Sequence, residues 1–198
     1  MIRNTTARIA TGLLASSLAL GGCTTAATDT GSPSTAVTSA VSSSAAASGA
    51  RFAPADVDFA EMMYPHHAQA VEMSKMVAGK DAGPDVVALA KQIEGAQQPE
   101  MDAFARLLRQ WGKPAPSASM GHHMDGMMTD EQMQHLGTLR GSAFDKAWLQ
   151  MMIAHHRGAI TMADAELKSG VDPEARTIAQ DIKASQQAEI DRMQKLLG

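Results

Sequence analysis

Hydrophobic positions recur with a helical period along most of the chain after residue 52. Apolar side chains appear every three or four residues in four long segments, with polar and charged residues between them, which is the pattern of amphipathic helices. The predicted long helices span residues 56–79, 85–111, 142–168 and 174–197. Pro84 and Pro173 stand near the start of the second and the fourth, where proline is favoured. The pattern predicts two helical hairpins and hence an all-α fold, a four-helix bundle.

A shorter helix is predicted in the connection between the two hairpins. Thr129 is followed by two acidic residues, and this arrangement suits a helix N-terminus. The short helix should end near Gly141. Pro65 and Pro99 fall inside the first and second long helices, where a proline removes one backbone hydrogen bond and kinks the helix. The sequence assigns these two prolines no role.

The second hairpin repeats the first at an offset of 89 residues. Residues 59–73 read FAEMMYPHHAQAVEM, and residues 148–162 read WLQMMIAHHRGAITM. The match continues without a gap into the second helix of each hairpin. Because an internal repeat constrains the architecture before any single residue does, we expect pseudo-twofold symmetry. Repeat one should span 56–111 and repeat two 142–198, with a Met/His-rich linker at 112–141.

The residues before the predicted helices carry signals of export. Arg3 and Arg8 precede a short apolar stretch that ends in small residues before Cys23, which is the layout of a lipoprotein signal peptide at residues 1–22. The stretch is too short to be a permanent membrane span. Residues 23–51 are rich in Ser, Thr and Ala, which predicts a disordered tether. We expect an exported protein anchored to the extracytoplasmic face of a membrane by a lipid on Cys23; the alternative is an ordinary secretory signal with an incidental cysteine.

Cysteine and charge content narrow the functional classes. Cys23 is the only cysteine, so no internal disulfide can form, and a lipidated Cys23 leaves no thiol for a metal ion. The chain has 17 basic and 21 acidic residues and a net charge of −4. It carries no basic stripe interleaved with aromatic residues, which argues against nucleic-acid binding. The folded domain should be residues 52–198.

Two adjacent histidines in each repeat are the strongest candidates for chemistry. His155 and His156 share one broad apolar arc of their helix, and such an arc should face the bundle interior. Each follows a methionine by four residues, so that an imidazole and a thioether can reach the same ion. Met73 and Met162 lie almost two turns farther on and either serve another layer or pack. The candidate metal ligands are His66, His67, His155, His156, Met62, Met63, Met151, Met152, Met73 and Met162.

The second helix of each hairpin places polar residues on an apolar stripe. Glu100 and Glu189 occupy equivalent positions in the two repeats, and Gln97 and Gln186 precede them by three residues. A glutamate on an apolar stripe is costly unless it is paired or coordinated. We expect these four residues to be metal ligands or to accept the free ring N–H of a ligand histidine. A purely structural hydrogen-bonding role is the alternative.

The linker between the hairpins is unusually rich in methionine and histidine. Short tracts of this kind suggest metal capture, although a loop of biased composition is the alternative. Thioethers prefer Cu(I), whereas imidazoles accept Cu(II) and Zn(II). Without a thiol, this donor set favours copper as the cofactor, with zinc as a second candidate. The linker candidates are Met120, His122, His123, Met124, Met127 and Met128.

The doubled motif MM-x-x-HH-x-x-A-[VI]-x-M, with A-x-x-I-x-x-[AS]-Q-Q-x-E-[MI] after it, resembles the bacterial family called domain of unknown function 305. The resemblance covers residues 52–198. It implies a ferritin-like four-helix bundle and export, and its CopM-like members bind copper and protect the cell envelope. It also implies ligands at His66, His67, His155 and His156 with nearby Met. Di-iron chemistry is not implied, because no histidine here follows a glutamate by three residues.

We therefore expect an exported lipoprotein, not an enzyme, that binds Cu(I) or Cu(II) through His/Met sites. Buffering, resistance or transfer to a copper-handling protein partner would be its task. A second hypothesis is a structural or partner-binding bundle whose histidines fill the core without metal. A copper oxidase is the third, and it lacks support because the sequence offers no nucleophile and no acid–base pair beyond the glutamates already named.

Overall fold

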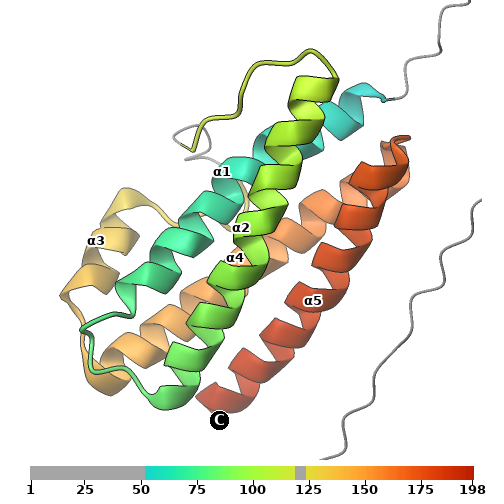
Figure 1. Cartoon of the computed structure of the whole chain (residues 1–198). Coiled ribbons are helices and arrows are strands. Elements are labelled where there is room, and N and C mark those ends of the chain that lie inside the picture. The colour runs from blue at the N-terminus through green and yellow to red at the C-terminus, as the bar shows by residue number, and fades with distance from the viewer. Residues whose placement is uncertain (1–51, 119–123) are drawn as a thin grey trace, which may run out of the picture. The chain divides into compact units, whose positions relative to one another are not determined.

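The computed structural model describes residues 52–118 and 124–198, and these residues form a helical bundle (Figure 1). The helices are α1 (Pro54–Met76), α2 (Pro84–Gln110), α3 (Asp130–Thr138), α4 (Gly141–Ser169) and α5 (Pro173–Leu197). The all-α fold is confirmed, and no strand occurs in the described ranges. The predicted signal peptide and tether lie outside them. None of the described helices is long and apolar enough to cross a membrane.

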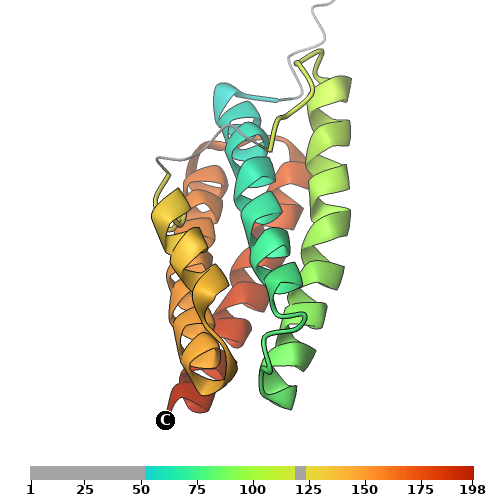
Figure 2. The same ribbon diagram turned by 90° about the vertical axis from the view of Figure 1, so that its left-hand side faces the viewer.

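The two hairpins meet mainly through their first helices. α1 packs chiefly on α2, α4 packs chiefly on α5, and α1 and α4 form the largest contact between hairpins. The short helix α3 contacts α4 and lies on the side away from α2 (Figures 1 and 2). The core divides into two apolar clusters, one with Met73, Leu136 and Trp148 and the other with Phe59 and Phe104. α3 contributes to the first cluster only.

Each hairpin caps a helix of the other. Near the start of α1, Asp56 is fully buried and accepts hydrogen bonds from the backbone N–H groups of Val171 and Asp172, at 3.0 and 2.9 Å, just before α5. At the equivalent position in α4, Asp145 accepts from the N–H of Gly83, at 2.9 Å, just before α2. Helix N-termini leave backbone donors without internal partners, so this reciprocal capping ties the two hairpins together.

The helix boundaries differ from the predicted ones mainly in the turns. The first helix was expected to reach residue 79 but ends at Met76. Gly79 and Asp81 have φ of +70° and +56°, values that a right-handed helix cannot contain. The short helix ends at Thr138 rather than near residue 141, because α4 already begins at Gly141. Its start is as expected, since Thr129 caps it by accepting from the Gln132 N–H.

Candidate metal centre

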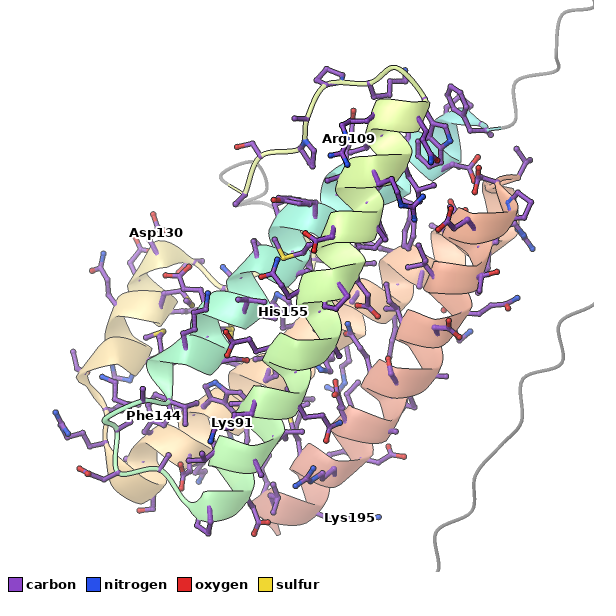
Figure 3. All side chains as sticks on the ribbon, viewed as in Figure 1. Lys91, Arg109, Asp130, Phe144, His155 and Lys195 are labelled. Carbon is purple, nitrogen blue, oxygen red and sulfur yellow. The ribbon has the colours of Figure 1, made fainter. Side chains whose placement is uncertain are left out.

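The four paired histidines lie in the middle of the bundle. His66 and His67 come from α1, and His155 and His156 come from α4; all four have an exposed fraction of 0%. His155 stands midway along α4 (Figure 3). The helical repeat explains this placement, because both pairs occupy the apolar arcs that α1 and α4 turn toward the interior. The expected inward orientation of the imidazoles is confirmed.

The His66 and His155 rings lie against each other across the contact of α1 and α4. Their centroids are 3.7 Å apart and the ring planes are inclined by 37°. The two residues occupy equivalent positions in the repeats, so their contact marks the pseudo-twofold relation between the hairpins. Uncharged rings can approach this closely, whereas two imidazolium ions would repel each other strongly.

The nitrogens of this pair are buried without partners. Within the part of the chain that the structure describes, neither Nδ1 nor Nε2 of His66 or His155 makes a hydrogen bond. Burial, and then the neighbouring His67 and His156, lower the pKa of His66 well below 6.5, and the approaching backbone of Asp125 offsets part of this. Burial and the other three imidazoles lower the pKa of His155 in the same direction. Both rings are therefore neutral at neutral pH, and each presents one N–H group and one nitrogen lone pair without a partner.

The second histidine of each pair, His67 or His156, which we call the outer histidine, has a carboxylate partner. His67 Nε2 lies 2.7 Å from Glu100 Oε2, and His156 Nε2 lies 2.7 Å from Glu189 Oε2. The repeat thus produces the same contact twice. The environments differ, because the Glu100 side chain is 24% exposed and that of Glu189 is 8% exposed. Glu189 also accepts from Gln92 at 3.0 Å. A carboxylate on one ring nitrogen orients an imidazole and leaves Nδ1 available.

The glutamines that precede these glutamates are buried as well. Gln97 and Gln186 are each 2% exposed. In residues 52–118 and 124–198 their amide oxygens and nitrogens find no hydrogen-bond partner. Buried amides are rarely left unpaired, so these two side chains are candidates to complete a polar centre with the histidines.

The predicted methionine ligands fall into different environments. Met63 and Met152 are fully buried, and so is Met73, which packs with Trp148 in an apolar cluster. Met62 is 40% exposed. Met151 and Met162 are half-buried. Met63 and Met152, four residues before His67 and His156, are the thioethers that the fold buries in the same stretch of α1 and α4 as the histidines.

The linker candidates are only partly described. Met120, His122 and His123 lie outside the described residues, as does Cys23. Met124 and Met127 are half-buried. Met128 is 5% exposed and belongs to the apolar cluster of Met73, Leu136 and Trp148, which we name the α3-side cluster.

In the described ranges, no three His, Cys, Asp or Glu side chains gather in a way that could hold a metal ion. A metal site in this part of the molecule therefore requires thioether or amide donors beside the imidazoles.

Sequence reasoning missed a buried carboxyl pair at the junction of α1, α4 and α5. Glu166 is 1% exposed, and its carboxyl group lies beside that of Asp56. Burial and the adjacent carboxyl group of Asp56 raise the pKa of Glu166 to about 8. Burial alone would raise the pKa of Asp56, but backbone N–H groups and Glu166 together lower it. Glu166 therefore carries the shared proton. The available signal was its place on the apolar arc of α4, where repeat one has Val77.

Comparisons with known proteins agree with this architecture. The sequence pattern of the family described as "Domain of unknown function (DUF305)" matches residues 56–197. A DUF305 protein of Streptomyces coelicolor, described as secreted, is 36% identical with a TM-score of 0.67, covering 72% of this chain and 91% of that one. A DUF305 fragment from Deinococcus radiodurans is 30% identical with a TM-score of 0.68, covering 74% and 97%. The search of curated proteins found no match.

The third relative was solved with metals. CopM in its Cu(II)-bound form is 32% identical with a TM-score of 0.64, covering 72% of this chain and 95% of that one. CopM was also solved with Cu(I) and with silver. Zinc, the second candidate cofactor from the sequence, gains no support from these relatives. From the matched pattern, the repeat of the His-His motif and the shared helical bundle, the chain belongs to the DUF305 family.

Proposed function

We propose that this protein binds copper at a centre built on the adjacent His66 and His155 rings. The observation that carries the proposal is the set of four ring nitrogens that are buried, neutral and unpaired. Leaving buried polar atoms without partners costs free energy. A metal ion would satisfy the nitrogen lone pair of each ring, and neutral imidazole is the form that binds metal.

The surrounding donors favour copper among the transition metals. Met63 and Met152 supply buried thioethers beside the histidine pairs, and thioethers select Cu(I) while imidazoles accept both copper states. His67 and His156 each keep an unpaired Nδ1 while Nε2 faces a glutamate. We assign Glu100 and Glu189 to orienting these rings. The copper-bound and silver-bound forms of CopM support the same choice of metal.

We propose that this binding takes place in the cell envelope. The basic residues, short apolar stretch and Cys23 at the start of the chain fit a lipoprotein signal, and a relative described as secreted supports export. Copper buffering, resistance or transfer to a partner protein fits an exported, lipid-anchored protein with exchangeable thioether ligands. A role as an enzyme has no support from the site, which offers no nucleophile activated by a base.

The test is a pair of volume-conserving substitutions. Replacing His66 and His155 together by leucine removes four unpaired buried nitrogens, so the metal-free protein should be at least as stable as the wild type. The variant should lose most tight copper binding in an anaerobic competition titration with a chromophoric Cu(I) chelator. His135→Leu is the matched control, because His135 is exposed on α3. Unaltered copper affinity in the double variant would reject the proposal.

A structural role for the histidines is the second candidate. The His67–Glu100 and His156–Glu189 contacts favour it, since both resemble ordinary buried hydrogen bonds. Thermal unfolding separates the two functions. A ligand that binds only the native state at a hundredfold excess over its Kd adds about 2.7 kcal/mol. A melting temperature that copper leaves unchanged would support the structural role.

A further inference from the structure

A short piece of the linker lies over the His66–His155 pair. Residues 124–128, which we name the cover segment, form a turn in which the Met127 N–H donates to the Met124 carbonyl at 3.1 Å. Gly126 takes φ of +84° at the third position of this turn, a conformation that glycine adopts without strain. The backbone of Asp125 approaches the His66 ring closely enough to affect its pKa. The cover segment thus separates the pair from solvent on this side of α1 and α4.

One residue of α1 clamps the cover segment. The Gln69 side chain accepts a hydrogen bond from the Met128 N–H at 2.7 Å and donates one to the Met128 carbonyl at 2.8 Å. Gln69 lies three residues after His66, so the clamp stands one turn from the His66 ring. Met128 itself is buried among the residues of the α3-side cluster. Both backbone groups of one cover residue are therefore satisfied by a single side chain.

One residue of α4 makes room for the same segment. A Cβ atom at Gly158 would stand 2.1 Å from the Asp125 carbonyl oxygen and 2.9 Å from the Gly126 Cα. A Cβ at Gly126 would meet the Ala154 carbonyl oxygen at 2.9 Å. Glycine in the interior of a helix is unfavourable, and here it permits a close approach of backbone to backbone. Gly158 lies three residues after His155, as Gln69 does after His66.

The repeat explains why these two residues differ. Gln69 and Gly158 occupy equivalent positions in the two hairpins. The chain has one linker between the two hairpins. Residues 124–128 of this linker therefore contact α1 and α4 differently, although the two helices are equivalent in the repeat. One equivalent position supplies the hydrogen bonds and the other supplies the space. This departure from the repeat is thus accounted for by one shared task, which is to hold residues 124–128 over the rings.

We infer that the cover segment is the entrance to the His66–His155 pair, and that Gln69 and Gly158 are positioning residues that govern how fast a metal ion enters and leaves. Both rings have an exposed fraction of 0%, so an ion reaches them only after a local opening. Three of the five cover residues carry thioethers, which suit a soft cation. The metal in this inference rests on the proposed copper function, whereas the access control does not.

The first experiment uses the full chain without metal. Diethyl pyrocarbonate modifies accessible imidazoles, and mass spectrometry follows each histidine separately, with exposed His135 as the internal reference. Gln69→Ala removes two hydrogen bonds to Met128, and Gly158→Ala places a Cβ 2.1 Å from the Asp125 carbonyl oxygen. Each should therefore accelerate modification of His66 and His155 about tenfold. The matched controls are Gln150→Ala, at an exposed position of α4, and Gly95→Ala, where no described atom lies within 4 Å of the added Cβ. Neither control should change the rates.

The second experiment measures exchange of Cu(I) by stopped flow, with a chromophoric chelator as the acceptor. Both test variants should take up and release Cu(I) about tenfold faster, with the equilibrium affinity altered by no more than about threefold. Weaker affinity at unchanged uptake would overturn the inference, since the segment would then be a ligand rather than an entrance. Wild-type His66 and His155 that react as fast as His135, or variants that react at the wild-type rate, would also overturn it. Faster modification in a protein that binds no copper would reject the proposed function and leave the entrance standing.

Discussion

The two ends of the α1–α4 contact are built from equivalent residues but are packed differently. At the α3 end, Met73 and Trp148 are fully buried, and Met151 packs against the same apolar cluster. At the other end, Phe59 and Met162 line a cavity of about 270 Å³ together with the 40% exposed Met62. Met73 and Met162 are equivalent in the repeat, as are Met62 and Met151. The helix face is set by the repeat, whereas burial depends on α3, which lies at one end only.

The carboxyl pair marks the same contrast. Asp56 and Asp145 are equivalent and cap helices of opposite hairpins. Glu166 joins Asp56, whereas its equivalent in the first repeat is Val77, which belongs to the apolar cluster at the α3 end. The end that α3 covers is therefore apolar, and the uncovered end holds a buried proton beside an open cavity. Equivalent positions of the two repeats can therefore carry different side chains, because α3 covers only one end of the α1–α4 contact.

The largest expected difference is between the two equivalent methionines. Met73→Ala should destabilise the protein by about 2–5 kcal/mol, because it removes a fully buried side chain and leaves a cavity. Met162→Ala should cost about 1 kcal/mol or less, because Met162 is half-buried and already faces a cavity. Urea unfolding of the two variants measures the difference. Equal losses would show that α3 does not determine the packing of this end.

A smaller difference is expected between the two glutamates that face the outer histidines. Glu189→Ala should cost about 1–3 kcal/mol in the metal-free protein, because it leaves buried His156 Nε2 without an acceptor. Glu100→Ala should cost less, since the Glu100 side chain is 24% exposed and water can replace it. Chemical denaturation without metal provides the comparison. If Glu100→Ala costs as much, solvent does not reach the first of the two contacts.

A pH-dependent effect should come from Glu166, and the lowered pKa of Asp56 offsets part of it. The folded pKa of Glu166, about 8, lies above its ordinary value of 4.5. The native state therefore holds more protons between these values, and the stability from this group falls as pH rises from 4.5 through 8. Asp172 supports the raised pKa of Glu166 and Arg176 opposes it.

Glu166→Gln should remove this dependence, because glutamine stays neutral and keeps a donor for Asp56. The difference in unfolding free energy between variant and wild type should grow with pH up to about 8 and then level off. Urea unfolding across this pH range measures it, and Glu72→Gln, at an exposed position of α1, is the control. Parallel profiles for wild type and Glu166→Gln would show that the proton is not held at Glu166.

Much of the centre could be predicted from the sequence. The apolar arcs of α1 and α4 predicted that all four imidazoles point inward, and their burial confirms it. Glu100 and Glu189 were expected to be ligands or to pair with a ligand histidine, and they lie beside His67 and His156. The contact between the His66 and His155 rings was not predictable, because helical periodicity fixes the direction of a side chain but not which side chain it meets.

The roles of Met62, Gln69 and Gly158 could likewise not be predicted from the sequence. Met62 shares the helix face of a ligand candidate yet is 40% exposed, because nothing among the described residues covers that end as α3 covers the other. Gln69 and Gly158 appeared as a mismatch in the repeat, and only the path of the linker gives them a common partner. Long-range contacts of this kind leave no periodic trace in a single sequence.

The helical class, the duplicated hairpins and the inward direction of the paired histidines could be read from the sequence alone. These depend on local periodicity, which a chain carries in every short window. Which equivalent residues differ in their surroundings depends on the tertiary structure. The α3 end buries Met73, Glu166 keeps a proton, and the backbone of residues 125–126 lies against α4 at Gly158. The physical reason is that burial and pairing depend on neighbours distant in sequence, and a pseudo-twofold bundle crossed by one linker gives equivalent positions different neighbours.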